Sequence, residues 1–215
     1  PPHQTLMPHP DVHVDYATDP VAAVADIITV HHNATNRAET TALHRALRGL
    51  HPNINLVAVS NQTINRGFAK ACNIGAATCG SPIVGFLNPD VTVHRPFIGD
   101  VTRCFASDPS VMIAGNRWNK PARELQLWGL DEWVCGAAMF VRRSWWAIAG
   151  GFDEQFVWSW EETDFVRRTQ EAGYRTVDLR LPIDHPVQGE NTPYKVEHFN
   201  IGRDRYRAKW KEPSA

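Results

Sequence analysis

The eight residues IVGFLNPD (83–90) begin with an unbroken apolar run and end in an Asn-Pro-Asp turn signal. A short apolar run bounded in this way is typical of a strand buried on both faces of a sheet. Similar runs occur at DIITVHHN (26–33) and NLVAV (55–59), and the segments 38–50 and 67–80, which lie between these runs, have helical character. Because strands and helices alternate at intervals of roughly 25 residues, the sequence predicts a parallel α/β sheet.

Further elements are expected on both sides of this alternation. They are a strand at 11–17, a brief helix at 19–25, a loop and then a strand within 123–143, a short helix at 144–154 capped by Ser144, a helix at 161–172 and a strand at 174–181. The proline-rich residues 1–10 are expected to be an unpacked lead-in, and the chain beyond the last strand to be loop followed by a basic tail.

The composition is that of an ordinary globular protein, with 215 residues, 43% of them hydrophobic, 21% charged, and a net charge of −1. A near-neutral balance gives no electrostatic sign of nucleic-acid binding, and no apolar run approaches the roughly 18 residues of a membrane span. No basic and apolar leader opens the chain, so a signal peptide is not expected. The cysteines lack metal-like spacing and are expected to be thiols in a reducing compartment: Cys72, Cys79, Cys104 and Cys135. We therefore expect a cytoplasmic protein, with peripheral attachment to a membrane as the alternative.

Several polar residues follow the predicted strands, where ligands of parallel α/β sheets bind. His32, Asn33 and Asp90 hold such positions. Asn88 and Asp90 could supply oxygen ligands to a metal–diphosphate group, although Asn-Pro-Asp could equally form only a turn. Gly67 could admit the chain to a helix whose N–H groups receive a phosphate, or it could simply form a turn.

The stretch VWSWEETDFVRR (157–168) admits a structural interpretation and a catalytic one. Ser159 and Glu162 have the spacing of a capping box, and Asp164 and Arg168 that of a surface ion pair on a helix. That interpretation leaves two neighbouring tryptophans, Trp158 and Trp160, without a role. Indoles suit the apolar faces of a sugar, and a carboxylate shielded beside them would have a raised pKa that suits a general base.

The order of these segments is more specific than any one of them. NRGFAKACNIG (65–75), FLNPDV (86–91), GAAMFVRRSWWAIAGGFDEQF (136–156), WEETDF (160–165) and a downstream histidine resemble the family-two inverting glycosyltransferases, most closely the members that transfer rhamnose or galactofuranose. The resemblance covers roughly residues 26–186. It implies a GT-A fold, an α/β single domain with a Rossmann-like, mostly parallel central sheet flanked by helices. The domain would span 11–185, with a nucleotide-binding half at about 11–95, an acceptor-binding half at about 96–185 and a C-terminal arm at 186–215.

The resemblance also assigns roles to individual residues. Glu162 matches the general base, Asp90 matches the aspartate of the metal-binding motif, and His185 matches a histidine that completes the shell of Mg²⁺ or Mn²⁺. The residues implied for the nucleotide are His32, Asn33, Asn65, Arg66, Gly67 and Asn88. Those implied for the acceptor are Trp158, Trp160, Glu161, Gly136 and Ala137, with Asp164 and Arg168 as structural residues near the site.

The implied activity is metal-dependent transfer, with inversion, of a sugar from a UDP- or dTDP-sugar to a hydroxyl of a carbohydrate, lipid-linked or protein acceptor. The chain departs from the family pattern at its start, where HVDYA (13–17) would be the first strand and the nucleobase would be read near His32 and Asn33. Two alternatives stay open. One is a catalytically weak protein that binds carbohydrate or nucleotide sugar, and the other is a sugar nucleotidyltransferase, although residues 1–25 lack the Gly-rich basic loop that it would need.

Overall fold

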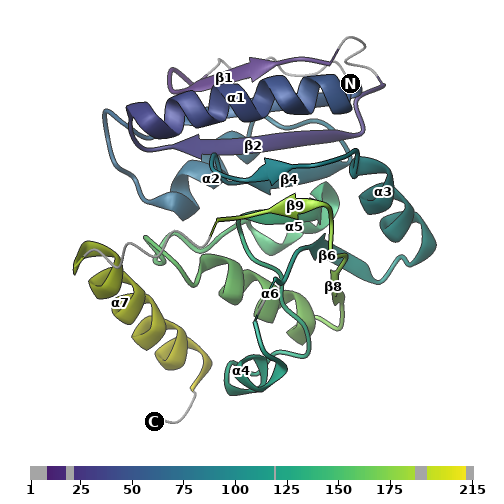
Figure 1. The fold of residues 1–215 in the computed structure, drawn as a ribbon. Helices are drawn as coiled ribbons and strands as arrows, with labels where there is room; N and C mark the ends of the chain where they lie inside the picture. The colour runs from purple at the N-terminus through teal and green to yellow at the C-terminus, as the bar shows by residue number, and fades with distance from the viewer. Residues whose placement is uncertain (1–8, 18–21, 119, 187–192, 212–215) are drawn as a thin grey trace.

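In the computed structural model, which describes residues 9–17, 22–118, 120–186 and 193–211, a seven-stranded sheet crosses the molecule (Figure 1). Its order is β1-β3-β2-β4-β7-β6-β8, and β5 pairs with β9 in a small separate sheet. The strands are β1 (Val12–Asp15), β2 (Ala25–His31), β3 (Ile54–Ser60), β4 (Ile83–Leu87), β5 (Thr92–Val93), β6 (Val111–Gly115), β7 (Ala138–Arg142), β8 (Arg175–Asp178) and β9 (Ile183–Asp184). Within the large sheet only β1 and β7 run against the other described strands, so the predicted mostly parallel α/β sheet is confirmed.

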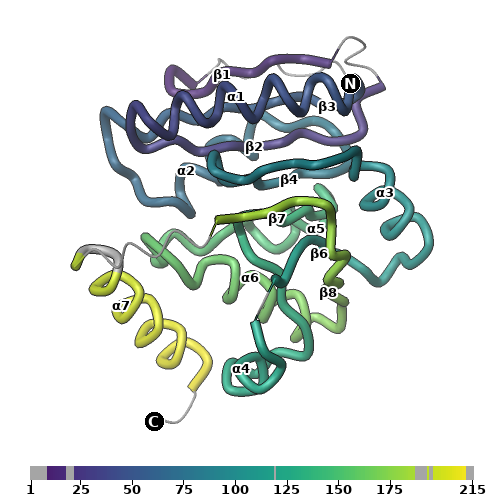
Figure 2. Tube along the Cα trace, viewed as in Figure 1, coloured from purple at the N-terminus to yellow at the C-terminus, as the bar shows by residue number. Residues whose placement is uncertain are grey.

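Helices cover both faces of the sheet, as the ribbon and the tube show (Figures 1 and 2). They are α1 (Ala34–Leu50), α2 (Phe68–Ala76), α3 (Ile98–Ser107), α4 (Ala122–Leu127), α5 (Arg143–Ala149), α6 (Glu161–Glu171) and α7 (Pro193–Trp210). Apolar side chains of α1 and α3 share one buried cluster with the sheet, and those of α2, α5 and α6 share the other. The sheet is therefore buried on both sides, which explains the unbroken apolar runs of β2 and β4.

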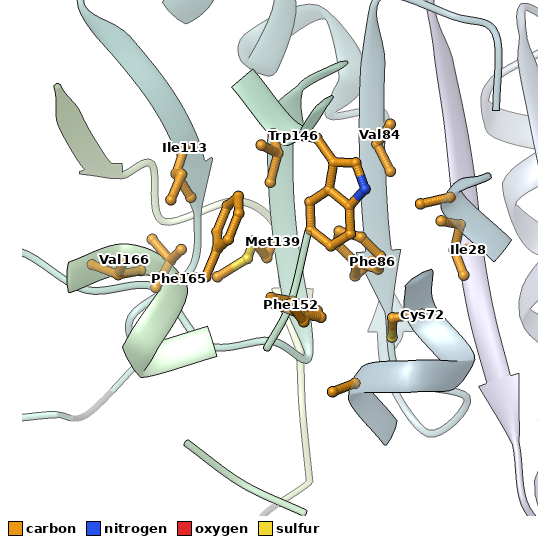
Figure 3. Close-up of a cluster of buried hydrophobic side chains, with 14 of the residues drawn as sticks. Ile28, Cys72, Val84, Phe86, Ile113, Met139, Trp146, Phe152, Phe165 and Val166 are labelled. Carbon is orange, nitrogen blue, oxygen red and sulfur yellow. The ribbon is translucent and has the colours of Figure 1, made fainter. Parts of the chain in front are cut away.

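The second of these clusters joins the two halves of the chain (Figure 3). Phe86 of β4 lies 4.8 Å from Trp146 of α5 and 5.2 Å from Phe152, measured between ring centroids. Phe165 of α6 lies 5.1 Å from the same Trp146 ring. Aromatic packing of this kind stabilises beyond the area that it buries, so the start of α6 is held firmly against the central strands.

The prediction of a helix at 19–25 is wrong for the described part of that range, because Ala25 already belongs to β2. Residues 18–21 lie outside the described residues. Asp26 is 2% exposed and accepts hydrogen bonds from Asn55 Nδ2 at 2.6 Å and from the Gly80 and Ser81 N–H groups at 2.8 and 2.7 Å. These long-range bonds hold the chain at the start of the predicted strand 26–33, which β2 extends by one residue to Ala25.

Helix starts also differ from their predictions. Asn33 is the N-cap of α1, with its side chain accepting from Asn36 N at 2.8 Å, so that helix begins before residue 38. Ser144 is not a cap, because α5 starts after Arg142 without a side-chain capping bond. The capping box of Ser159 and Glu162 is likewise absent, since α6 starts after Trp160 in a left-handed backbone conformation.

The segment predicted as loop and basic tail contains an 18-residue helix, α7, which packs beside α6. Tyr206 is fully buried, and its hydroxyl donates to Trp128 O at 2.6 Å. Gly202 faces the Trp160 indole, where an added Cβ would lie 2.7 Å from Cδ1. Helix α7 therefore covers an aromatic surface that α6 alone would leave exposed, and this tertiary contact outweighs its weak helical pattern.

Asp164 anchors α7 to α6. The predicted pair with Arg168 forms at 2.8 Å, but Asp164 is 0% exposed and not at the surface. Its other oxygen accepts from Lys209 Nζ at 2.8 Å and from Trp210 Nε1 at 3.1 Å. One buried carboxylate thus joins two helices.

Replacing Asp164 with alanine is expected to lower the free energy of unfolding by about 2–3 kcal/mol. Removing one member of a buried ion pair costs about 3–5 kcal/mol, and we reduce that value because Arg168 and Lys209 are partly exposed. Chemical denaturation measures the change. Asp204→Ala, which breaks an exposed ion pair on α7, is the control and should cost less than about 0.5 kcal/mol. Equal effects of the two substitutions would contradict the anchoring role.

Candidate active site

Polar side chains gather where the three central parallel strands end. His32 follows β2, Asn61 follows β3 and Asn88 follows β4. The strand predicted to open the family pattern, near 13–17, is an antiparallel edge strand instead, and β2 is the first strand of the parallel set. The parallel set therefore begins with the second strand of the chain, and the residues predicted to read the nucleobase follow that strand.

Asn61 organises this edge and was missed by the sequence analysis. It is 2% exposed, and its Nδ2 lies 3.1 Å from His32 Nδ1 and 3.3 Å from both Asn65 Oδ1 and Gly67 O. Its Oδ1 accepts from Arg66 N at 3.0 Å. A single amide therefore connects the predicted nucleotide residues into one loop. Its position, one residue past a buried strand, is the signal that could have revealed it.

Gly67 allows the loop to enter α2. Its φ of 82° lies in the left-handed region, and an added Cβ would lie 2.8 Å from Val157 O. The first N–H of α2, that of Phe68, donates to the same Val157 carbonyl at 2.9 Å. This N–H group is therefore not available to a phosphate, and the glycine instead brings the stretch before α6 against α2.

Asn88, Asp90 and His185 come together although 95 residues separate the last two. His185 Nε2 lies 3.4 Å from Asp90 Oδ1 and 3.4 Å from Asn88 Nδ2. The Trp118 ring covers the imidazole at a centroid distance of 5.4 Å. The side chains of Asp90 and His185 are partly exposed, at 22% and 26%, so a ligand can reach both.

Asn116 holds the chain segment that precedes His185. It is 3% exposed, donates to Leu181 O at 3.0 Å and to Ile183 O at 3.2 Å, and accepts from Leu181 N at 2.6 Å. These bonds fix the segment that leads into His185. Neither Asn116 nor Trp118 was identified from the sequence.

One carboxylate and one imidazole can supply only part of the ligand set of a divalent cation. Within the described ranges no group of three or more His, Cys, Asp or Glu side chains could hold a metal ion. The neutral Asn88 stands where a second acid would complete such a group. Asp90 and His185 are therefore suited to a cation that takes its remaining oxygen ligands from phosphate and water.

Glu162 lies at the start of α6, beside Gly136. A Cβ added at Gly136 would lie 3.5 Å from Glu162 Cβ, which is an ordinary van der Waals contact. Its Oε2 is buried without a hydrogen-bond partner in the described part of the chain. Burial raises the pKa of Glu162, against the backbone N–H groups at the helix start and the charge of Lys120, which lower it. A half-buried carboxylate with one unpartnered oxygen is suited to accept a proton.

Glu161 lies deeper and is 5% exposed. Burial and the neighbouring charge of Glu162 raise its pKa well above the ordinary glutamate range. Of the two, Glu162 is the more exposed and so the better placed to meet a substrate. Because Glu161 is the more buried of the two, its carboxyl is favoured to hold a proton, while the carboxyl of Glu162 is favoured to be charged.

Trp158 and Trp160, which precede α6, have different surroundings. Trp158 is half-buried, and its ring lies 5.8 Å from that of His32 in an edge-to-face contact. Trp160 is 5% exposed and packs against Trp128 and Tyr206 at 5.1 and 5.2 Å. Trp158 can therefore present an aromatic surface to a ligand, whereas Trp160 belongs to the contact with α7.

Backbone strain accompanies this arrangement. Ser159 and Trp160 have φ values of 63° and 77°, the left-handed region that side chains rarely adopt. Such conformations cost about 1–3 kcal/mol each and persist where the surroundings impose them. Here the contacts of Trp160 and the bond from Phe68 N to Val157 O hold the turn that places Glu162.

The sheet, the helices on both faces and the site at the strand ends define a GT-A type α/β fold, and solved structures agree. A mannosyltransferase from Pyrobaculum calidifontis, in complex with GDP-Man and Mn²⁺, is similar with a TM-score of 0.63 and 17% identity, over 94% of this chain and 68% of its own. GalNAc-T7 with UDP, GalNAc and Mn²⁺ gives 0.52 and 10%, over 88% and 50%. TarS from S. aureus gives 0.50 and 11%, over 86% and 39%. No curated protein sequence matches the chain.

The sequence profile of glycosyl transferase family 2 matches residues 35–170, more than half of the chain. The chain belongs to this family. The predicted resemblance is therefore confirmed at the level of the family, and glycosyl transfer is the general activity that the family and fold support.

Proposed function

We propose that this protein is a metal-dependent inverting glycosyltransferase that moves a sugar from a nucleoside-diphosphate sugar to an acceptor hydroxyl. The observation that carries the proposal is the unpartnered, buried Oε2 of Glu162 next to Gly136. Asp90 and His185 supply the second requirement, a place for the cation that accompanies the diphosphate. Binding of sugar alone would need neither group.

The reaction is a single displacement. The acceptor hydroxyl gives its proton to Glu162 while its oxygen forms a bond to the anomeric carbon. The bond between that carbon and the diphosphate oxygen breaks, and its electron pair leaves with the diphosphate. Attack opposite the leaving group inverts the configuration at the anomeric carbon. A bound Mg²⁺ or Mn²⁺ would supply charge neutralisation for the leaving diphosphate.

The surrounding residues have matching roles. Asp90 and His185 would hold the cation, and the loop ordered by Asn61 would contact the nucleotide of the UDP- or dTDP-sugar that the resemblance implies. Trp158 and the backbone at Gly136 and Ala137 would form the acceptor side. Two of the similar structures contain Mn²⁺, which supports the choice of cation.

The halves of the domain would divide this work, with the nucleotide bound by residues of about 11–95 and the acceptor by those of about 96–185. All four cysteines are free, which is consistent with a cytoplasmic protein. No helix among the described residues is long and apolar enough to cross a membrane.

Release of nucleoside diphosphate from a panel of nucleotide sugars tests the proposal. We expect slow release with Mn²⁺ or Mg²⁺, faster release when a suitable acceptor hydroxyl is added, and almost none with EDTA. A binding protein would take up nucleotide sugar without releasing the diphosphate. A nucleotidyltransferase would instead release pyrophosphate from a nucleoside triphosphate and a sugar phosphate. Either of these two results would contradict the proposal.

A further inference from the structure

Helix α7 lies beyond residues 35–170, the stretch that the family profile matches. It nevertheless covers Trp160, which stands two positions before Glu162 in the chain. The ring of Trp160 packs against Tyr206 and Phe199 of α7 at centroid distances of 5.2 and 5.4 Å. A helix outside the matched stretch therefore contacts the turn that precedes the proposed base.

Packing holds the indole of Trp160. The residue is 5% exposed, and its Nε1 forms no hydrogen bond with any residue that the structure describes. The Tyr206 ring beside it is fully buried and is fixed in turn by its hydroxyl, which donates to Trp128 O at 2.6 Å. The Trp128 ring lies 5.1 Å from that of Trp160. Because no hydrogen bond directs the indole, its position depends on the shapes of these neighbours.

Gly202 brings the backbone of α7 against the same indole. A Cβ at residue 202 would lie 2.7 Å from Trp160 Cδ1 and 3.1 Å from Ser159 O. Neither neighbour is the flexible end of a long side chain, so any larger residue at this position must displace the turn or the helix. Glycine is a poor helix former, and this close approach explains its presence inside α7.

The turn at Trp160 leads directly into α6. Its carbonyl oxygen accepts from Asp164 N at 2.9 Å, a backbone bond that closes the first turn of the helix. Glu162 lies within the segment that this bond closes. The left-handed backbone of Ser159 and Trp160 persists only where the surroundings impose it. A shift of the indole would therefore move the first turn of α6 and change the position of Glu162 relative to Gly136.

We propose that Gly202 and Tyr206 of α7 are positioning residues for glycosyl transfer. They hold the Trp160 indole, and the turn at Trp160 then holds Glu162 beside Gly136. This role rests on the proposed function, because it takes Glu162 as the base. Helix α7 would thus set the rate of the chemical step without contacting the nucleotide or the cation.

Gly202→Ala tests this role in the full chain. The added methyl group should displace the Trp160 indole, and because a misplacement of about 1 Å can cost about a hundredfold in rate, we expect kcat for transfer to fall at least about tenfold. KM for the nucleotide sugar and the affinity for UDP in Mn²⁺ should stay close to the wild-type values, since Asp90 and His185 lie on other segments. Gly49→Ala is the matched control, because a Cβ added there on α1 meets nothing within 4 Å, and it should leave kcat unchanged.

Variants of Tyr206 separate positioning from stability. Tyr206→Ala removes the ring that packs against Trp160 and should lower kcat at least about tenfold, whereas Tyr206→Phe keeps the ring and should recover most of that rate. Tyr206→Phe loses the bond to Trp128 O, so its Tm should fall although its kcat is largely kept. A role confined to stability predicts instead that kcat follows Tm through the whole series. Gly202→Ala keeps the test decisive if Tyr206→Ala fails to fold.

A crystal structure of the Gly202→Ala variant tests the geometry without measuring activity. We expect Trp160 and Glu162 to be displaced relative to Gly136. An unmoved turn, or a wild-type kcat in Gly202→Ala, would overturn the role of α7 and leave the proposed function standing. Wild-type transfer by Glu162→Gln would contradict the proposed base itself, and the positioning role would fall with it.

Discussion

Glu162→Gln is expected to reduce glycosyl transfer at least about a hundredfold while leaving the fold intact. An amide cannot accept the proton of the acceptor hydroxyl, and losing a general base typically costs about 10²–10⁴ in rate. The fold should survive because glutamine has nearly the same shape and can still accept from the N–H groups at the start of α6. Transfer rate, melting temperature and binding of nucleoside diphosphate measure the three quantities separately. A near wild-type rate would show that Glu162 is structural.

Glu161→Gln is the matched control, since it changes the adjacent carboxyl of the same helix. We expect a smaller loss of transfer, because Glu161 is buried away from solvent and its raised pKa favours the neutral acid, which glutamine resembles. A loss as large as that of Glu162→Gln would move the base to Glu161.

The raised pKa values also set the direction of the pH dependence. A base must be ionised, so transfer should fall as pH decreases through the raised pKa of Glu162, at a higher pH than for an ordinary glutamate. Stability should change in the opposite sense. Because the folded protein holds the proton of Glu161 more tightly than the unfolded chain, stability falls as pH rises toward the raised pKa. Glu161→Gln should remove that part of the dependence, as measured by denaturation at several pH values.

Asp90→Ala is expected to abolish metal-dependent binding of nucleoside diphosphate and, with it, transfer. Asn88 is neutral, so Asp90 supplies the acid of the pair with His185, and no third described His, Cys, Asp or Glu completes a metal group to compensate. Calorimetric titration with UDP, in Mn²⁺ and in EDTA, measures the effect. Equal affinities for the variant and the wild-type protein in both conditions would contradict the assignment.

His185→Ala separates the cation from the acceptor. It should weaken retention of Mn²⁺ more than it weakens acceptor binding, because the imidazole lies 3.4 Å from Asp90 Oδ1 and faces that carboxylate. Asp184→Ala, at the adjacent exposed position, is the control and should change neither quantity. A structure with Mn²⁺ bound and His185 turned away would exclude it as a ligand.

Local patterns in the sequence predicted the central framework. The apolar runs of β2, β3 and β4 could only be satisfied by burial on both faces, and the polar residues after them necessarily fell at one edge of a parallel sheet. Glu162, Asp90 and His185 were identified because their motifs stand in a specific order along the chain. These features depend on neighbouring residues and on chain order, which a sequence displays directly.

Other features depended on contacts between distant residues. Asp26, at the start of the predicted strand 26–33, is held by bonds to Asn55, Gly80 and Ser81, which no local pattern shows. The burial of Trp160 and Asp164 required α7, whose sequence has little amphipathic character and is helical because it covers α6.

The sequence by itself therefore determined the fold class, the family and the edge of the sheet that holds the site. Tertiary structure alone decided which side chains meet there: the bridge of Asn61, the pairing of Asp90 with His185, and the different surroundings of Trp158 and Trp160. The reason is physical. Periodicity and turn signals act over a few residues, whereas burial, unpartnered polar atoms and buried charge depend on packing between segments far apart in the chain.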